Sequence, residues 1–158
     1  GNTMLEKALA LDPEHHQARG MLGDALRWQG HHTRAAREYR RAIASVLRGK
    51  NMVALNSRTR ISLAYYFSCL GQFERSTALL EQCRKEALTS GLLSFRSATA
   101  LLISGHKGRA ETELRRALKL GLPFAAVRAH PDWRSRVQLS DLTASVSRQH
   151  AVGERERT

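Results

Sequence analysis

The fold is decided by the stretch from Ala64 to Cys83, AYYFSCLGQFERSTALLEQC, and by a similar stretch from Ala98 to Ala117, ATALLISGHKGRAETELRRA. In each stretch an apolar helical run ends at a glycine, Gly71 or Gly105, and a second helical run follows. The two glycines lie 34 residues apart. A helix, a glycine turn and a second helix are typical of an antiparallel helical hairpin. The spacing therefore predicts hairpins in tandem.

A third glycine, Gly30, stands in the same context near the start of the chain. Five residues after each glycine comes a small residue, and nine residues after it comes a bulky one. The small residues are Ala35, Ser76 and Ala110, and the bulky ones are Tyr39, Leu80 and Leu114. Small residues allow helices to cross closely, and a repeat of this kind must stack on its neighbours to bury its apolar face. Gly23, inside the first predicted helix, also indicates close approach of a neighbouring helix, because glycine there costs about 1 kcal/mol relative to alanine.

The pattern predicts hairpins over about 14–48, 52–90 and 92–120. The interval from Gly30 to Gly71 is 41 residues, seven more than the second interval. Either a longer helix from Met52 to Leu70 or a longer loop at Gly49–Asn51 absorbs the difference, and helical apolar spacing from Met52 favours the helix. We expect a cap over 123–147, with Trp133 as its anchor and a final amphipathic helix, and a disordered tail over 148–158.

In these residues the chain resembles the tetratricopeptide repeat family. The first match is Ala8-Leu-Ala-Leu-Asp-Pro13, which reads as the end of a hairpin, so we expect the chain to begin inside a repeat of a longer protein. The resemblance covers about residues 5–121, and the ending from Ala129 to Trp133 is similar to caps of larger bacterial proteins. Further matches are Ala18, Leu22, Gly23, Ala25, Gly30, Ala35, Tyr39 and Ala42, then Leu63, Ala64, Phe67, Gly71, Phe73, Ser76, Leu80 and Cys83, then Ala98, Leu101, Gly105, Ala110, Leu114 and Ala117.

The resemblance implies a single all-α domain over 1–147, a right-handed superhelical stack of antiparallel hairpins with a C-terminal capping helix. It also implies a concave groove that binds a peptide or a helix from another protein. The groove positions carried over to this chain are Arg27, Trp28, Arg58, Ile61, Tyr65, Phe95, Arg96 and Leu102. The alternative interpretation is that the chain's own final helix fills this surface. One subfamily holds a C-terminal carboxylate with a clamp of Lys, Asn and Arg, but only Arg96 matches it here, so we reject that clamp.

The chain carries a formal net charge of +12, which favours anionic partners and makes binding sensitive to salt. Four arginines recur at spacings of 3, 4 and 7 on one predicted helix: Arg34, Arg37, Arg41 and Arg48. We call them the basic stripe. The stripe indicates either a contact surface for acidic proteins or nucleic acid, or a solvated outer face. No recognition-helix motif, aromatic stacking platform or zinc pattern accompanies it.

Other features limit the function classes. Cys69 and Cys83 are predicted to lie about 13 Å apart along the helices, too far for a disulfide, so we expect free thiols in a reducing, cytoplasmic setting. The histidine pairs His15-His16 and His31-His32 flank a helix and do not converge on a metal. No phosphate-binding glycine loop, nucleophile elbow or helical metalloprotease motif is present, and no cofactor or metal is predicted. No apolar run is long enough to cross a membrane.

The sequence therefore predicts a non-catalytic scaffold that binds a segment of another protein in the groove around Tyr65 and Phe95. Two alternatives stay open. The chain is a basic regulatory module that contacts nucleic acid or acidic proteins through the stripe, or it is a self-association or sensor segment of a larger regulatory protein. The sequence leaves the partner, the oligomeric state and the organism undetermined.

Overall fold

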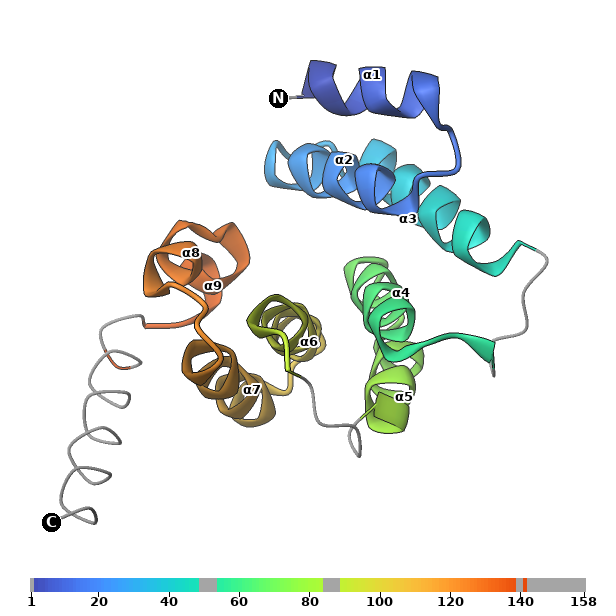
Figure 1. The fold of residues 1–158 in the computed structure, drawn as a ribbon. Coiled ribbons are helices and arrows are strands. Elements are labelled where there is room, and N and C mark those ends of the chain that lie inside the picture. Colours follow the sequence, from blue (N-terminus) through green and yellow to red (C-terminus); the bar gives the residue numbers. More distant parts are fainter. Residues whose placement is uncertain (1, 49–53, 84–88, 139–140, 142–158) are drawn as a thin grey trace, which may run out of the picture. The chain divides into compact units, whose positions relative to one another are not determined.

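The computed structural model describes residues 2–48, 54–83, 89–138 and 141. The described residues fold into helices joined by short turns, and none of them forms a strand (Figure 1). This is the all-α fold that the sequence predicts. The helices are α1 Asn2–Leu11, α2 His16–Trp28, α3 His32–Leu47, α4 Ser57–Cys69, α5 Phe73–Cys83, α6 Gly91–Ile103, α7 Lys107–Lys119, α8 Phe124–Ala129 and α9 Pro131–Arg136.

The glycine turns are the feature that makes the hairpins. Gly30, Gly71 and Gly105 have φ values of 87°, 76° and 88°, in the left-handed region that side chains with a Cβ disfavour. In each turn the residue after the glycine donates its backbone N–H to a carbonyl five residues back, as His31 does to Leu26 at 2.8 Å. This is the Schellman pattern of a helix C-terminus. Gly121, with φ of 100°, closes α7 in the same way.

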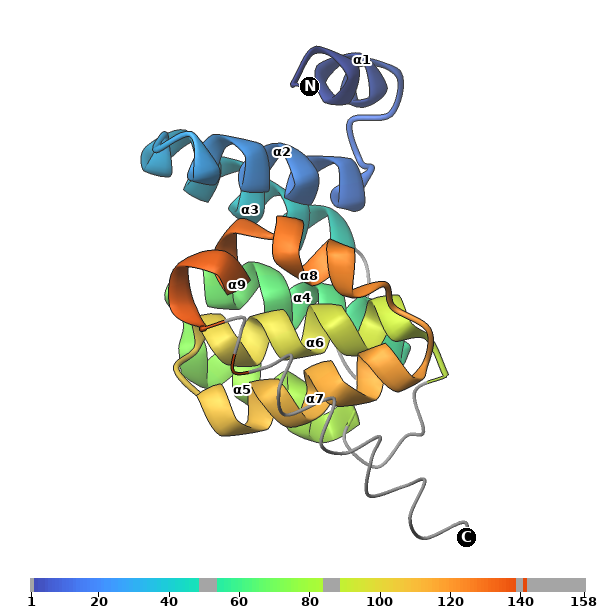
Figure 2. The ribbon, with the colours of Figure 1, turned by 90° about the vertical axis from the view of Figure 1, so that its left-hand side faces the viewer.

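Contacts divide the chain into two compact units, residues 1–88 and 89–158. In the first unit α2 packs on α3 and α4 packs on α5 as hairpins. The helix α1 packs on α2 at a crossing angle (Figures 1 and 2), and α3 packs on α4. The small residues after two of the turns are buried as predicted, since Ala35 is 1% exposed and Ser76 is 0% exposed. The Ser76 hydroxyl donates to the Ala64 carbonyl at 2.6 Å, which joins α5 to α4.

In the second unit α6 and α7 run side by side as a hairpin (Figure 2), and α9 packs on both α6 and α8. Ala110 and Leu114 of α7 are fully buried. The predicted anchor Trp133 is also fully buried, and its indole N–H donates to the Thr99 hydroxyl of α6 at 3.0 Å. The cap therefore covers α6 through one large side chain. The single domain over 1–147 stays a prediction, as does the right-handed superhelix.

The predicted long helix from Met52 to Leu70 is wrong at its start. The helix α4 begins at Ser57, because the Asn56 side chain accepts the Thr59 backbone N–H at 2.9 Å and so caps it. Residues 54–56 precede the helix in short non-α-helical structure, with Leu55 buried. The helices α4 and α6 have the same length, so the extra residues of the 41-residue interval lie before Ser57 and not in α4.

Several predictions concern residues outside the described part of the chain. These are the Gly49–Asn51 loop, the end of the second hairpin after Cys83, most of the final amphipathic helix and the tail over 148–158. The described part of the cap ends with α9 and the residues just after it. Both cysteines are free, as predicted.

Gly23 supports a prediction about packing. A Cβ on Gly23 would lie 2.8 Å from Cε1 of Tyr39, so α3 approaches α2 there too closely for any side chain. Gly23→Ala gains about 1 kcal/mol of helix propensity but forces the Tyr39 ring to move, and we expect a net loss of about 1–2 kcal/mol in the free energy of unfolding. Urea unfolding followed by circular dichroism measures this change.

Gly108 provides the matched control on α7. Nothing lies within 4 Å of a Cβ at this position, and its φ is not positive. Gly108→Ala should therefore stabilise the chain by up to about 1 kcal/mol. Equal shifts for the two variants would contradict the close approach at Gly23.

Candidate functional site

A polar cluster joins three helices in the interior of the first unit. Asp24 of α2 accepts hydrogen bonds from the Tyr39 hydroxyl at 2.5 Å and from the Tyr65 hydroxyl at 2.6 Å. Tyr39 belongs to α3 and Tyr65 to α4. Arg27, one turn after Asp24, donates to both tyrosine oxygens at 3.1 and 3.3 Å and lies 3.7 Å from the Asp24 carboxylate. One carboxylate and one guanidinium thus hold α3 and α4 onto α2.

Burial determines the protonation state of the tyrosines in this cluster and of the neighbouring Cys69 thiol. Desolvation is the largest cause that raises the pKa of both Tyr39 and Tyr65 above the ordinary value for tyrosine, and the nearby Cys69 and Asp24 raise it further. Burial likewise raises the pKa of the Cys69 thiol to about 12, although Arg27 opposes the shift. Cys69 is therefore protonated at neutral pH and is a poor nucleophile. The cluster is built to hold helices together.

An apolar hollow of about 480 Å³ lies between α1 and α2. It is lined by Asn2, Met4, Leu5, Met21, Asp24, Ala25 and Trp28. Three large apolar side chains of its lining are exposed to solvent: Met4 is 76% exposed, Met21 56% and Trp28 43%. Leu11, on the same helix as Met4, is 90% exposed. Around the hollow, Met4, Met21 and Trp28 form an exposed apolar surface, which we call the α1–α2 face. Clustered exposed apolar side chains indicate a contact surface.

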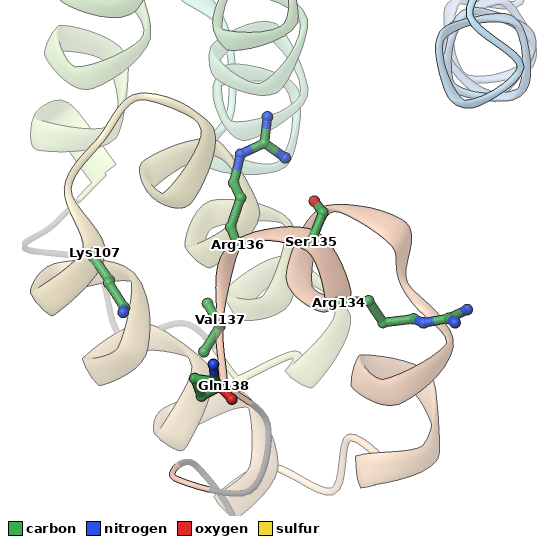
Figure 3. A pocket seen from close by; sticks show the side chains of 6 residues that line it. All are labelled: Lys107, Arg134, Ser135, Arg136, Val137 and Gln138. Atoms are coloured by element: carbon green, nitrogen blue, oxygen red, sulfur yellow. The ribbon is translucent and has the colours of Figure 1, made fainter.

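A second hollow, of about 590 Å³, lies beside α7 and α9 in the second unit. Its charged residues do not converge on one point. Figure 3 shows Arg134 and Arg136 extending in different directions, with Lys107 on the opposite wall. Arg136 also donates to Asp132 at 2.8 Å, which offsets its charge. The other lining residues are Ser135, Val137 and Gln138. This arrangement lacks the convergent donors of an anion site.

The family model described as Tetratrico peptide repeat matches residues 17–92. Residues 17–92 belong to the tetratricopeptide repeat family. No curated protein and no solved structure matches the chain. Tetratricopeptide repeats generally mediate protein–protein interaction and are typically non-catalytic modules. The matched segment contains α2 to α5, and α6 and α7 repeat the same hairpin with the same glycine turn.

The structure places the predicted groove residues of the repeats in very different surroundings. Trp28 is exposed, and the Arg27 guanidinium lies 5.8 Å from its ring, although Arg27 is also engaged in the polar cluster. Arg58 is exposed at the start of α4. Ile61, Tyr65 and Leu102 are buried, with at most 5% of their surface exposed. Of these side chains, only those of Trp28 and Arg58 are classed as exposed.

The cap explains the surroundings of Phe95. Its ring stacks on Trp133 of α9 with centroids 6.1 Å apart and meets His130 edge-on at 5.3 Å. The neighbouring Arg96 is half-buried. A segment of the chain itself, α9, therefore packs on Phe95. Most of the final amphipathic helix named in the alternative interpretation lies outside the described residues.

Arg34, Arg37 and Arg41 of the basic stripe lie on the outside of α3, and Arg48 directly follows its last residue; all four are exposed. Two of them have carboxylate partners within the chain. Arg41 lies 3.3 Å from Glu38, and Arg48 lies 3.0 Å from Glu14. Glu38 also binds Arg19 at 3.0 Å. Glu38 lies on the same helix as Arg41, whereas Glu14 is distant in sequence from Arg48 and sequence reasoning missed it.

Two classes of site receive no support from the described residues. No group of three or more histidines, cysteines or acidic residues is placed to hold a metal ion in that part of the chain. His15 caps α2 by accepting the Ala18 N–H, and His16 contacts the Tyr66 hydroxyl at 3.0 Å, so both have structural roles. No described helix is long and apolar enough to cross a bilayer.

Sequence reasoning missed Met4 and Met21 as candidate site residues. The signal was present, because Met4 and Leu11 lie seven residues apart and thus share a face of α1, opposite Glu6. This face is apolar where a solvated helix would be polar. Met21 and Trp28 likewise lie seven residues apart and thus share a face of α2.

Proposed function

We propose that the chain is a non-catalytic interaction module that binds an apolar helical segment of another protein at the α1–α2 face. The observation that carries this proposal is the hollow between α1 and α2, with Met4, Met21 and Trp28 around it. A concave apolar surface is the usual form of a helix-in-groove site. The family of the repeats supports protein binding as the general activity.

The α1–α2 face fits this role better than the groove around Tyr65 and Phe95. Tyr65 is 5% exposed and donates its hydroxyl proton to Asp24, while Phe95 is stacked under Trp133. A partner could reach the Tyr65 ring only by displacing contacts within the first unit, and the Phe95 ring is half-buried beside Trp133. Trp28 is shared by both surfaces, because it is a predicted groove residue that also lines the hollow.

The chemistry of the face favours a partner with bulky aliphatic or aromatic side chains. Methionine is flexible and polarisable, so Met4 and Met21 can adjust to different side chains. Trp28 offers a large rigid contact area, and tryptophan is enriched among the residues that dominate binding energy. A partner helix would present its side chains at i, i+3, i+4 and i+7, which is the spacing of anchors in such grooves.

A display library of helical peptides, selected against the chain, tests the proposal. The selected peptides are then measured by fluorescence anisotropy against Trp28→Ala/Met21→Ala. We expect this double variant to weaken binding at least about tenfold, since each buried anchor contributes more than about 1 kcal/mol.

The matched control is Phe73→Ala/Leu92→Ala, which removes two exposed apolar side chains from α5 and α6. Phe73 is 43% exposed, the same as Trp28, and Leu92 is 73% exposed. Binding should be unchanged in the control. Selection of no peptide, or equal loss in the two double variants, would overturn the proposal.

A further inference from the structure

The basic stripe occupies one narrow side of α3. At 100° per residue, Arg34, Arg37, Arg41 and Arg48 fall within about 60° of one another around the helix axis, and they span about 21 Å along it. All four are exposed, as is the adjacent Arg40. A row of guanidinium groups of this length, on a chain of formal net charge +12, produces a strong local positive potential.

The chain's own carboxylates show how the row binds acidic groups. Glu14 approaches Arg48 from the loop before α2, and Glu38 approaches Arg41 from the same helix. Both contacts lie between 3.0 and 3.3 Å, the distance of direct ion pairs. Arg34 and Arg37, at the beginning of α3, have no ion pair among the described residues. The half of the stripe nearest the Gly30 turn is therefore not paired with any carboxylate of the described residues.

We infer that the basic stripe is a second interaction surface, which binds an acidic helix of a partner protein. An acidic helix with Asp or Glu at i, i+3 and i+7 repeats its carboxylates at about 4.5 and 10.5 Å along its axis. Arg34, Arg37 and Arg41 are spaced by the same helical rise. A helix laid parallel along α3 can thus meet three arginines in register, and Arg–carboxylate pairs favour bidentate hydrogen bonds.

Nucleic acid fits this surface less well. Single strands bind where exposed aromatic rings interleave with positive charge. The aromatic residue of α3, Tyr39, is 1% exposed, and its hydroxyl bonds to Asp24. The surface thus offers charge without a stacking partner. This second surface lies on α3, whereas the proposed apolar site lies on α1 and α2, so either proposal can fail alone.

The experiment uses a fluorescent synthetic peptide, about three turns longer than α3, with glutamate at i, i+3 and i+7 in an alanine–glutamine background. The non-helical comparison is the same peptide with one central alanine replaced by proline. A labelled DNA duplex is the third probe. Anisotropy is measured at about 50 mM and about 200 mM salt, because ion pairs at an exposed surface are screened over this range. We expect the helical peptide to bind best, and to bind at least fivefold more weakly at the higher salt.

Two double variants separate the stripe from total charge. Arg34→Gln/Arg37→Gln removes arginines without carboxylate partners in the described chain, so the fold keeps its ion pairs. Arg128→Gln/Arg134→Gln removes two exposed arginines of the second unit. Each double variant lowers the formal net charge of +12 by two. We expect about a tenfold loss of peptide binding in the first and less than a twofold loss in the second.

Three results would overturn the inference. The first is absence of peptide binding at the lower salt, and the second is an equal loss of binding in both double variants. The third is tighter binding of DNA than of the helical peptide with the same dependence on Arg34 and Arg37, which would make the stripe a nucleic-acid surface. Binding of the proline peptide as tightly as the helical one would also count against a helical partner.

Discussion

Replacing Ala35 by glutamate is expected to lower the free energy of unfolding by about 3–5 kcal/mol, the largest effect that we predict for a substitution in the hairpins. Ala35 is 1% exposed on α3, which packs against α2. A glutamate there either buries an unpaired charge or takes up a proton, and it also adds volume to a closely packed contact. Thermal unfolding followed by circular dichroism measures the loss.

The control is the same substitution on the exposed side of the same helix. Ala44 is exposed, and a glutamate there lies three residues after Arg41 and four before Arg48. Ala44→Glu should change the stability by less than about 0.5 kcal/mol, and pairing with these arginines favours a small gain. If the two variants melted at the same temperature, the register of the α2–α3 hairpin would be wrong.

Replacing Trp133 by alanine is expected to cost about 3–5 kcal/mol in the second unit, because a fully buried indole is removed and a cavity remains. The substitution also removes the hydrogen bond to the Thr99 hydroxyl and uncovers the ring of Phe95. Trp133→Phe, which retains most of the apolar surface, should lose less than half as much. Urea unfolding followed by circular dichroism compares the three proteins.

Trp28→Ala is the matched control, since it removes the same side chain from an exposed position. Trp28 is 43% exposed on α2, so we expect a loss within about 1 kcal/mol. Similar losses for Trp28→Ala and Trp133→Ala would show that the cap does not depend on the buried indole.

The hairpins were predictable because their determinants are local. A glycine with positive φ, a small residue five positions later and a bulky residue nine positions later all act within one helix–turn–helix unit. Gly30, Gly71 and Gly105 occupy the predicted turns, and the small residues after them are buried. The role of Trp133 was also readable, since a large aromatic residue after the last hairpin has an apolar face to cover.

The first residue of α4 and the burial of the predicted groove residues could not be predicted from the sequence in the same way. Helical apolar spacing continues upstream of Ser57, but α4 begins at Ser57 because Asn56 caps it. The sequence alone does not show whether the capping residue or the apolar spacing sets the first residue of the helix. Family likeness placed Tyr65 and Phe95 on a groove, because their positions face one in a regular array. It could not show that Asp24 engages Tyr65 or that α9 covers Phe95, since these contacts join residues far apart in sequence.

The repeated glycine turns have a consequence for the order of folding. Each turn is closed by bonds between residues five apart or closer, as in the pair Gln72–Phe67 at 2.9 Å and the pair His106–Leu101 at 2.9 Å. Bringing together two helices joined by such a turn costs little conformational entropy. Proteins dominated by contacts of this short range fold in microseconds to milliseconds. Each hairpin can therefore form early, before neighbouring hairpins associate. The polar cluster around Asp24, which joins α2 to α4, belongs to a later step, when neighbouring hairpins associate.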